Sequence, residues 1–290
     1  MSLNFLDGLY IFPFILKSNI EEIDILNLKI RKIKKEERTM ISKIEKAPLV
    51  DSEHIAFKDN FFNKCNYVVE TCIQNQNFND ISLFDNCIRM FELSNAGLHI
   101  GFNFNNKFMK YFHQLGTSKP HCQLLQTLEL NESKIENLKS LFENLIKTDK
   151  KPSEKDKLEL VLKRYRRASS YAAGGRITLD DRILDIAIIL EILYLSDARD
   201  ELTYKISTRI ANLFKKKIDD SISAYEFYNK AKTFYKLRSA IVHSGKSKNK
   251  SENNNYFLEF LEIARKSIIL FIEDPEIFKS ENLERICFDS

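Results

Sequence analysis

The sequence has no close pair of cysteines and no apolar run long enough to cross a membrane. Its five cysteines are Cys65, Cys72, Cys87, Cys122 and Cys287, and none are spaced as C-x-x-C. An odd number of scattered cysteines, without a secretory leader, is typical of reduced thiols, so we expect a cytoplasmic protein. The longest apolar run, residues 183–195, is too short for a bilayer and contains Asp185 and Glu191. We therefore expect no membrane partner.

Motifs for metal and phosphate chemistry are also lacking. There is no clustered carboxylate set for two metals, no glycine-rich phosphate loop and no H-E-x-x-H. A zinc site from Cys65, Cys72 and His121 is conceivable, but the spacing fits no finger and favours free thiols instead. His99, His113 and His121 match no ligand set either. We expect no metal and no cofactor.

The composition is that of a globular protein with one concentrated basic region. Hydrophobic residues make up 43% and charged residues 30% of 290 residues, enough for one or two domains with a core. Residues 215–250 hold ten Lys or Arg against three Asp or Glu, a local charge of +7, and the rest of the chain carries −3. This distribution suits an anionic substrate, although a solvated lysine-rich loop explains residues 246–250 equally well.

The first 130 residues have strand character, and we predict that they form a β-rich α+β region. Residues 8–16 are aromatic and β-branched, with Pro13 indicating an edge strand or a bend. Residues 23–33 alternate apolar and polar side chains, as a strand with one wet face does. Residues 54–70 and 81–105 add shorter strand-like runs. We take residues 1–130 as the first domain.

Residues 131–290 have the pattern of a helical domain, so the predicted fold class is α+β. Four helix starts are marked by Ser133 with Glu136, by Pro152, by Thr178 with Asp180, and by Ser223 with Glu226. The helix over residues 181–195 is apolar nearly all round and is predicted to lie in the middle of a bundle. Its Glu191 needs a cationic partner, and Arg238 and Arg209 are the candidates. Asp185 is expected to face the helix start or solvent.

The stretch Tyr235-Lys236-Leu237-Arg238-Ser239-Ala240-Ile241-Val242-His243-Ser244-Gly245 ends a predicted amphipathic helix. An Arg can grip two phosphate oxygens, and a His can exchange a proton near neutral pH. Five residues turn a helix by about 140°, so the two side chains converge only if the last turn distorts or His243 lies beyond it. The alternative is a His that complements the helix dipole and a solvated Arg.

This stretch, the run Ile188 to Leu195 and the run Asp200 to Ala211 resemble, in order and spacing, the Apea-like family of the HEPN superfamily. The resemblance covers residues from about 130 to 274. It implies a bundle of four to five helices for residues 131–290. Catalytic members are endoribonucleases that need no metal and commonly dimerise, so that two Arg/His pairs meet in one composite site.

The resemblance implies that Arg238 and His243 catalyse RNA cleavage by attack of the 2′-OH. Supporting roles would fall to Glu191, Ser239, Arg209 and Tyr235, and RNA binding to Lys236, Lys246 and Lys248. Ser239 departs from the Asn, Asp or His that many HEPN ribonucleases carry at this position. Tyr235 can stack on a base, but core packing is favoured.

The implied partners are RNA, with tRNA as one candidate, and a second copy of the chain in a homodimer. A role in bacterial anti-phage defence by abortive infection is also implied, with a phage-derived trigger or a cognate inhibitor. The resemblance then implies that residues 1–130 sense the trigger or restrain the nuclease. The alternative function is a non-catalytic HEPN module for RNA, nucleotide or protein binding, or for dimerisation alone.

Overall fold

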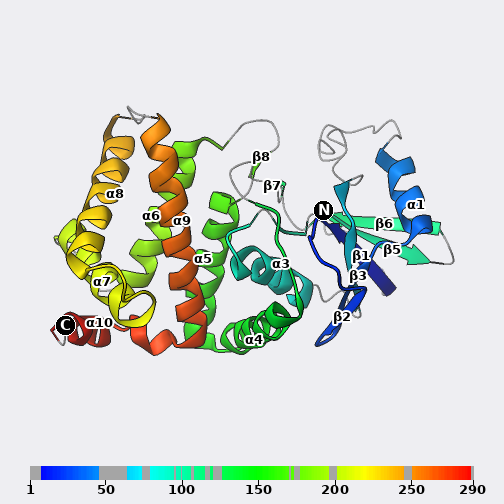
Figure 1. Ribbon diagram of the computed structural model, residues 1–290, viewed down its shortest axis with the longest axis horizontal. Helices are drawn as coiled ribbons and strands as arrows, with labels where there is room; N and C mark the ends of the chain where they lie inside the picture. Colours follow the sequence, from blue (N-terminus) through cyan, green and yellow to red (C-terminus); the bar gives the residue numbers. More distant parts are fainter. Residues whose placement is uncertain are drawn as a thin grey trace. The chain divides into compact units, whose positions relative to one another are not determined.

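The computed structural model describes residues 8–45, 64–73, 79–94, 96–98, 100–105, 108–114, 118–119, 126–169, 171–172, 177–195, 201–244 and 250–288. A sheet built mainly from the N-terminal part is followed by a series of helices, which confirms the α+β fold class (Figure 1). The chain divides into two compact units. The first comprises Met1–Ile146 with Ser170–Arg176, and the second comprises Lys147–Ser169 with Ile177–Ser290.

The first unit contains a six-stranded antiparallel sheet in the order β2-β3-β4-β1-β5-β6. Its strands are β1 (Gly8–Phe14), β2 (Glu22–Ile25), β3 (Leu28–Lys32), β4 (Tyr67–Ile73), β5 (Ile100–Asn105) and β6 (Phe108–Gln114). A separate pair joins β7 (Ser118–Lys119) to β8 (Tyr171–Ala172). The helices of this unit are α1 (Lys35–Glu45), α3 (Asn79–Phe91) and most of α4 (Glu132–Asp149).

Two strand predictions in this unit are wrong in detail. Residues 23–33 form the hairpin of β2 and β3, because Leu26 adopts φ 54° and turns the chain. Strand β1 is central between β4 and β5 and is not an edge strand. The proline is tolerated there because β5 pairs with Tyr10 and Ile11, and Pro13 lies beyond that pairing.

The predicted strand character of residues 81–105 is wrong for the first part of that run. Residues Asn79–Phe91 form α3, which buries Ile81, Phe84 and Ile88 at helical spacing. Asp85 and Arg89 form a buried ion pair one turn apart, with 3.0 Å between Arg89 Nε and Asp85 Oδ2. In a short run, apolar residues are compatible with the strand period as well as with the helix period. The Asp85–Arg89 pair, four residues apart, agrees with the helix.

Helix α4 lies almost entirely in the first unit, which extends to Ile146, whereas the predicted second domain begins at residue 131. Phe142 of α4 packs edge-on against Phe84 of α3, with ring centroids 5.0 Å apart. The predicted cap at Ser133 is wrong, because the backbone N–H of Lys134 donates to Asn131 Oδ1 at 3.1 Å. The helix therefore begins at Glu132, next to Asn131.

The second unit is helical. Its elements are α5 (Pro152–Ser169), α6 (Leu179–Tyr194), α7 (Leu202–Lys217), α8 (Ala224–Ser244), α9 (Lys250–Glu273), the short η2 (Pro275–Phe278) and α10 (Ser280–Phe288). The predicted starts at Pro152 and Ser223 are confirmed, and Ser223 Oγ accepts the N–H of Glu226 at 3.1 Å. Gly174 and Gly175, predicted to break the chain before α6, lie outside the described residues.

Helix α6 lies in the middle of this unit, as predicted, and packs against α5, α7, α8 and α9. A capping box starts it: Thr178 Oγ1 accepts the N–H of Asp181, and the Asp181 carboxylate accepts the N–H of Thr178. The acidic member of the box is thus Asp181, one residue after the predicted Asp180. Near the other end of α6, a hydrogen bond of 2.9 Å joins the hydroxyls of Tyr194 and Ser267 and so connects α6 to α9.

Candidate functional site

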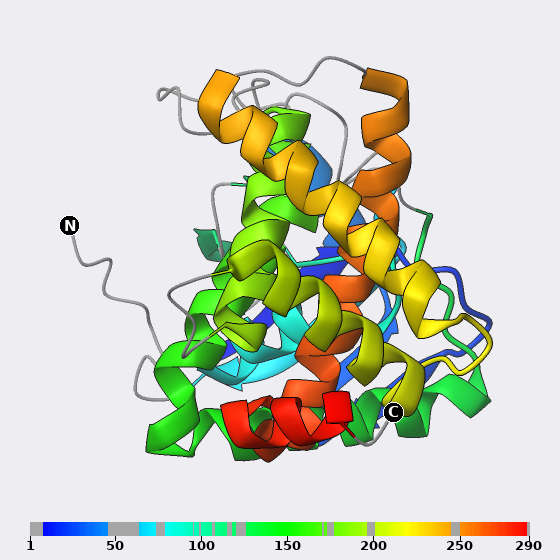
Figure 2. The ribbon, with the colours of Figure 1, turned by 90° about the vertical axis from the view of Figure 1, so that its left-hand side faces the viewer.

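Helix α8 carries the predicted catalytic residues and runs unbroken through His243 to Ser244. It lies beside α7, and both helices face the viewer in Figure 2. Aromatic packing fixes its inner face, where Phe234 stacks on Phe260 of α9 with ring centroids 4.0 Å apart. The predicted stop at Gly245 and the predicted RNA-binding residues Lys246 and Lys248 lie outside the described residues.

Glu191 and Arg238 form the ion pair at the centre of the candidate site. Arg238 Nη2 lies 3.2 Å from Glu191 Oε1, in the last turn of α6, and the two side chains are 33% and 28% exposed. Of the two predicted partners of Glu191, the structure confirms Arg238. Burial raises the pKa of the Glu191 carboxyl above its ordinary value, although the Arg238 guanidinium acts in the opposite direction.

His243 is exposed and lies on a different face of α8 from Arg238. Because the helix is regular between them, five residues separate the two positions by about 140° in angle and about 7.5 Å along the axis. Neither of the conditions for their convergence is met in the described helix, since its last turn is regular and contains His243. Ser239 lies between them, about 40° from His243 around the axis.

Tyr235 lies under Arg238, in the core of the second unit. Its hydroxyl donates to the carbonyl oxygen of Ala187 in α6 at 3.3 Å. Burial and the nearby Glu191 carboxylate raise the pKa of Tyr235 well above its ordinary value. The ring is buried and not open to a base, so Tyr235 packs in the core, where it also meets the Phe234 ring with centroids 5.8 Å apart.

Arg209 serves the end of α6. Its Nη1 donates to the carbonyl oxygen of Tyr194 at 2.7 Å, and its Nη2 donates to Ser280 Oγ at 3.1 Å and lies 3.3 Å from Glu284. These bonds join α6 to α10. Arg209 is therefore not the partner of Glu191, and its described contacts support the fold beside the site.

The ion pairs of Asp185 correct a prediction. This carboxylate is 1% exposed, and its oxygens lie 2.9 Å from Arg164 Nη1 and 3.3 Å from Arg167 Nε of α5. It faces neither solvent nor the helix start. Burial nevertheless raises the pKa of Asp185 above its ordinary value. The available sequence signal was an acid inside a nearly all-apolar helix, next to a helix with two arginines one turn apart.

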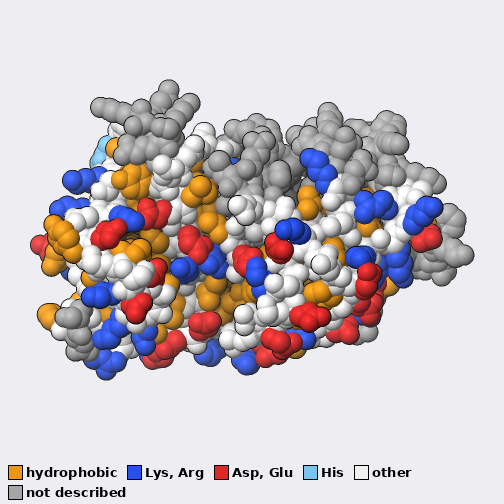
Figure 3. All heavy atoms as spheres, in the orientation of Figure 1, with side chains coloured by type: hydrophobic (Ala, Val, Ile, Leu, Met, Phe, Trp, Pro, Cys, Tyr) orange, Lys and Arg blue, Asp and Glu red, His pale blue; other side chains and the backbone are white. Residues whose placement is uncertain are grey.

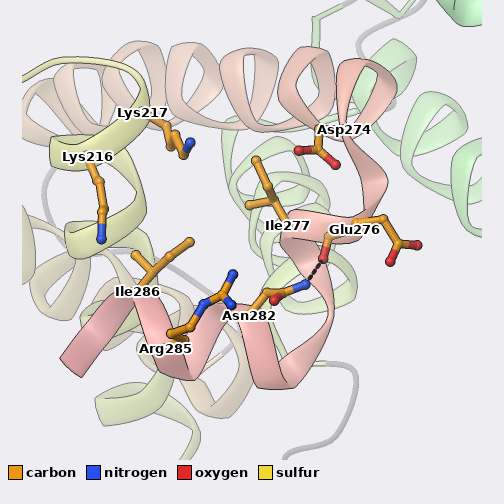
Figure 4. A pocket seen from close by; sticks show the side chains of 8 residues that line it. All are labelled: Lys216, Lys217, Asp274, Glu276, Ile277, Asn282, Arg285 and Ile286. Atoms are coloured by element: carbon orange, nitrogen blue, oxygen red, sulfur yellow. Dashed lines mark hydrogen bonds between the residues drawn. The ribbon is translucent and has the colours of Figure 1, made fainter. Parts of the chain in front are cut away.

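A separate surface hollow of about 520 Å³ lies between the ends of α7, α9, η2 and α10 (Figure 4). It is lined by Lys216, Lys217, Asp274, Glu276, Ile277, Asn282, Arg285 and Ile286. Asn282 Nδ2 closes one side by donating to the carbonyl oxygen of Glu276 at 2.8 Å. The lining mixes cations and carboxylates and contains none of the predicted site residues.

The surface charge is mixed on the face shown in Figure 3, where basic and acidic side chains alternate over most elements. On α8, Lys230 is neutralised by Glu259 at 2.8 Å and by Glu226 at 3.7 Å. Lys232 and Lys236 are exposed and lie on the same side of the helix as His243. The predicted RNA-binding residue Lys236 therefore lies on the same side as the exposed imidazole, about 10.5 Å before it along the helix axis.

Two further findings concern the described part of the chain. No group of three or more His, Cys, Asp or Glu residues there is arranged to hold a metal ion. None of the described helices combines the length and hydropathy needed to cross a bilayer.

Comparison with known proteins gives no relatives: no family model, no curated protein and no solved structure matches this chain.

Proposed function

We propose that the protein is a metal-independent endoribonuclease of the HEPN type, with Arg238 and His243 as its catalytic residues. The observation that supports this most is the Glu191–Arg238 pair. A carboxylate in the last turn of α6 fixes a partly exposed guanidinium on the same helix that presents an exposed imidazole. A purely structural bundle has no need for either group at these positions.

The reaction is an internal transesterification. The RNA 2′-oxygen attacks the adjacent phosphorus, the P–O5′ bond breaks, and the products carry a 2′,3′-cyclic phosphate and a 5′-OH. His243 takes the proton of the 2′-OH or supplies one to the leaving 5′-oxygen. Arg238 neutralises the non-bridging oxygens as charge builds in the transition state. DNA lacks the 2′-OH and is not a substrate.

A second copy of the chain completes the site. Arg238 and His243 of one helix point about 140° apart. One phosphodiester therefore contacts an arginine and a histidine together only when the α8 of a second copy supplies one of the two side chains. This fits the composite site that the resemblance to HEPN dimers implies. The same resemblance supports a cytoplasmic role in anti-phage defence, in which a trigger or cognate inhibitor acts through the first unit and cleavage of RNA, for instance tRNA, aborts infection.

The alternative function is a non-catalytic module that binds RNA, a nucleotide or a protein. One observation favours it: Arg238 is already paired with Glu191 and lies on a different face from His243. An RNA-binding protein of this kind would retain RNA without cutting it.

The first prediction separates the two functions. Purified wild type, His243→Ala and the control Val242→Ala are incubated with total tRNA in excess EDTA, and fragment ends are mapped. We expect wild type and Val242→Ala to leave cyclic-phosphate ends, and His243→Ala to be slower by about 10²- to 10⁴-fold, because it loses its proton-transfer group.

Binding without cleavage by all three proteins would support the non-catalytic module. Equal cleavage by all three would place the active site elsewhere.

A further inference from the structure

The outer side of α8 carries tyrosines and lysines from Tyr225 to Lys236. At about 100° per residue, Tyr225, Tyr228, Lys232, Lys236 and His243 fall within an arc of about 80°. Tyr225 is 75% exposed, and both lysines and His243 are exposed as well. The opposite side of the helix is buried, with Phe227 and Phe234 in the core. This arc is therefore a surface and not part of the packing of the bundle.

Helix α7 adds a third tyrosine to this surface. The Tyr204 ring is 58% exposed and meets Tyr228 edge-on, with ring centroids 6.2 Å apart. Lys232 Nζ also lies over the Tyr228 ring, 5.6 Å from its centroid. Tyr228 therefore contacts both a second ring and a cation. We call Tyr204, Tyr225, Tyr228, Lys232 and Lys236 the tyrosine–lysine face.

The charge of this face is positive. Glu226 is the single acid of α8; it lies about 100° from Tyr225 around the axis and 3.7 Å from Lys230. Lys232 and Lys236 therefore have no carboxylate beside them on α8. Aromatic rings and cations on one face make up a surface on which unpaired bases can stack while phosphates are neutralised.

We propose that the tyrosine–lysine face binds a single strand of RNA and guides it to His243. Eighteen residues separate Tyr225 from His243, which is about 27 Å of helix and room for several stacked nucleotides. Unpaired bases can leave their own stack for a tyrosine ring, whereas the bases of an A-form duplex are already stacked and cannot. The proposal rests on the ribonuclease function above and specifies unpaired RNA as its substrate.

The lysines distinguish this surface from a protein interface. The buried centres of protein–protein interfaces are depleted in lysine, because each ammonium would have to be desolvated. Here Lys232 and Lys236 lie along the helix axis between the tyrosines of α8 and His243. A bound strand of RNA places its phosphates beside these ammonium groups and leaves the groups in contact with water, so they need not be desolvated.

The test measures binding by fluorescence anisotropy with the full-length protein. The probe is a labelled RNA of about 12 nucleotides, within the range of single-strand site sizes, with 2′-O-methyl riboses that cannot be cleaved. The same probe annealed to its complement provides the duplex. Variants are Tyr225→Ala, Tyr204→Ala, Tyr225→Phe and Lys232→Gln. The control is Phe288→Ala, which removes an 88% exposed ring on α10.

We expect wild type to bind the single strand more tightly than the duplex. Each Tyr→Ala change should weaken single-strand binding by about 5- to 100-fold, because one stacked base is lost. Tyr225→Phe keeps the ring and should bind like wild type, as should Phe288→Ala. Lys232→Gln should weaken binding and reduce its dependence on salt.

Three results would overturn the proposal: no binding of the single strand, equal binding by the Tyr→Ala variants, or equal affinity for the duplex. Conversion of a dimer to a monomer by Tyr225→Ala, with RNA binding unchanged, would make the surface a contact between copies instead. The ribonuclease function is judged separately by cleavage. Tyrosine-dependent binding without cleavage upholds this surface and rejects the nuclease, and cleavage without tyrosine dependence does the reverse.

Discussion

Arg238 is held by a carboxylate that is itself costly to bury. Glu191 lies in the last turn of α6, where neighbouring side chains remove much of its water and raise its pKa. The Arg238 guanidinium offsets part of that cost and in return is fixed in position. A guanidinium fixed before substrate arrives needs no reorganisation when charge develops on a phosphate, which is what stabilisation of a transition state requires.

Replacement of Glu191 by Gln should therefore separate stability from activity. The carboxyl has a raised pKa in the folded state, so wild type loses stability as pH rises from about 4.5 through that pKa. The Gln variant has no group that titrates at this position, so it does not lose stability in this way. When both proteins are unfolded with urea at several pH values between about pH 5 and pH 8, the free energy of unfolding of the variant should rise relative to that of wild type as pH increases. Cleavage should fall by about 10- to 100-fold, because Arg238 is no longer oriented.

Glu259→Gln is the matched control. It removes a carboxylate of α9 that pairs with Lys230, which lies on α8 as Arg238 does. It should leave cleavage unchanged. A pH-independent difference between wild type and Glu191→Gln would contradict the assignment of Glu191 as the titrating group.

At the scale of single elements, the start of α6 decides where the site lies. The capping box of Thr178 and Asp181 satisfies backbone N–H groups that the first turn leaves without helical partners. It fixes the first residue of the helix and so the turn in which Glu191 meets α8. Helix α8 is fixed differently, by the stack of Phe234 on Phe260 along its inner side.

Thr178→Ala should lower the free energy of unfolding by about 1 kcal/mol, because the N–H of Asp181 loses its acceptor. Chemical denaturation measures the change. Thr233→Ala is the matched control, since Thr233 lies in the middle of α8 and its hydroxyl bonds only to the preceding turn, at Asn229. Its effect should be near zero, because alanine is a better helix former than threonine. Equal losses in both variants would argue against a specific role for the cap.

At the scale of the whole molecule, the proposed catalysis requires two chains. Helical geometry keeps Arg238 and His243 of one chain on different faces, so the proposed site joins the arginine of one copy to the histidine of another. Most homodimers are twofold symmetric, which generates two equivalent sites of this kind.

Mixing two inactive variants tests this arrangement. Arg238→Ala and His243→Ala should each be inactive, yet their mixture should regain about a quarter of wild-type cleavage, because half of random dimers are mixed and each holds one intact site. The mass in solution should be twice the 34.0 kDa of one chain. A mixture as inactive as its components would show that both residues act within a single chain.

Local patterns alone determined much of the second unit. Proline at the first turn, a Ser or Thr cap and apolar residues at helical spacing predicted the starts at Pro152, Thr178 and Ser223, and each of these signals acts within a few residues. The central place of α6 also followed from its composition, because a helix that is apolar all round must be covered on all sides. The same signals misled in shorter runs, where the residues of α3 were predicted to have strand character and the hairpin of β2 and β3 was predicted as a single strand.

Only the tertiary structure decided which partner each charged residue meets. Glu191 needed a cation, but the choice between Arg238 and Arg209 depended on how α6 crosses α8 and α7. Asp185 was expected to face the helix start or solvent and is buried against two arginines of α5. The alignment of Tyr204 with the tyrosines of α8 is a matter of packing in the same way. Such pairings join residues far apart in the chain, so they are set by how whole helices pack and not by the pattern within any one of them.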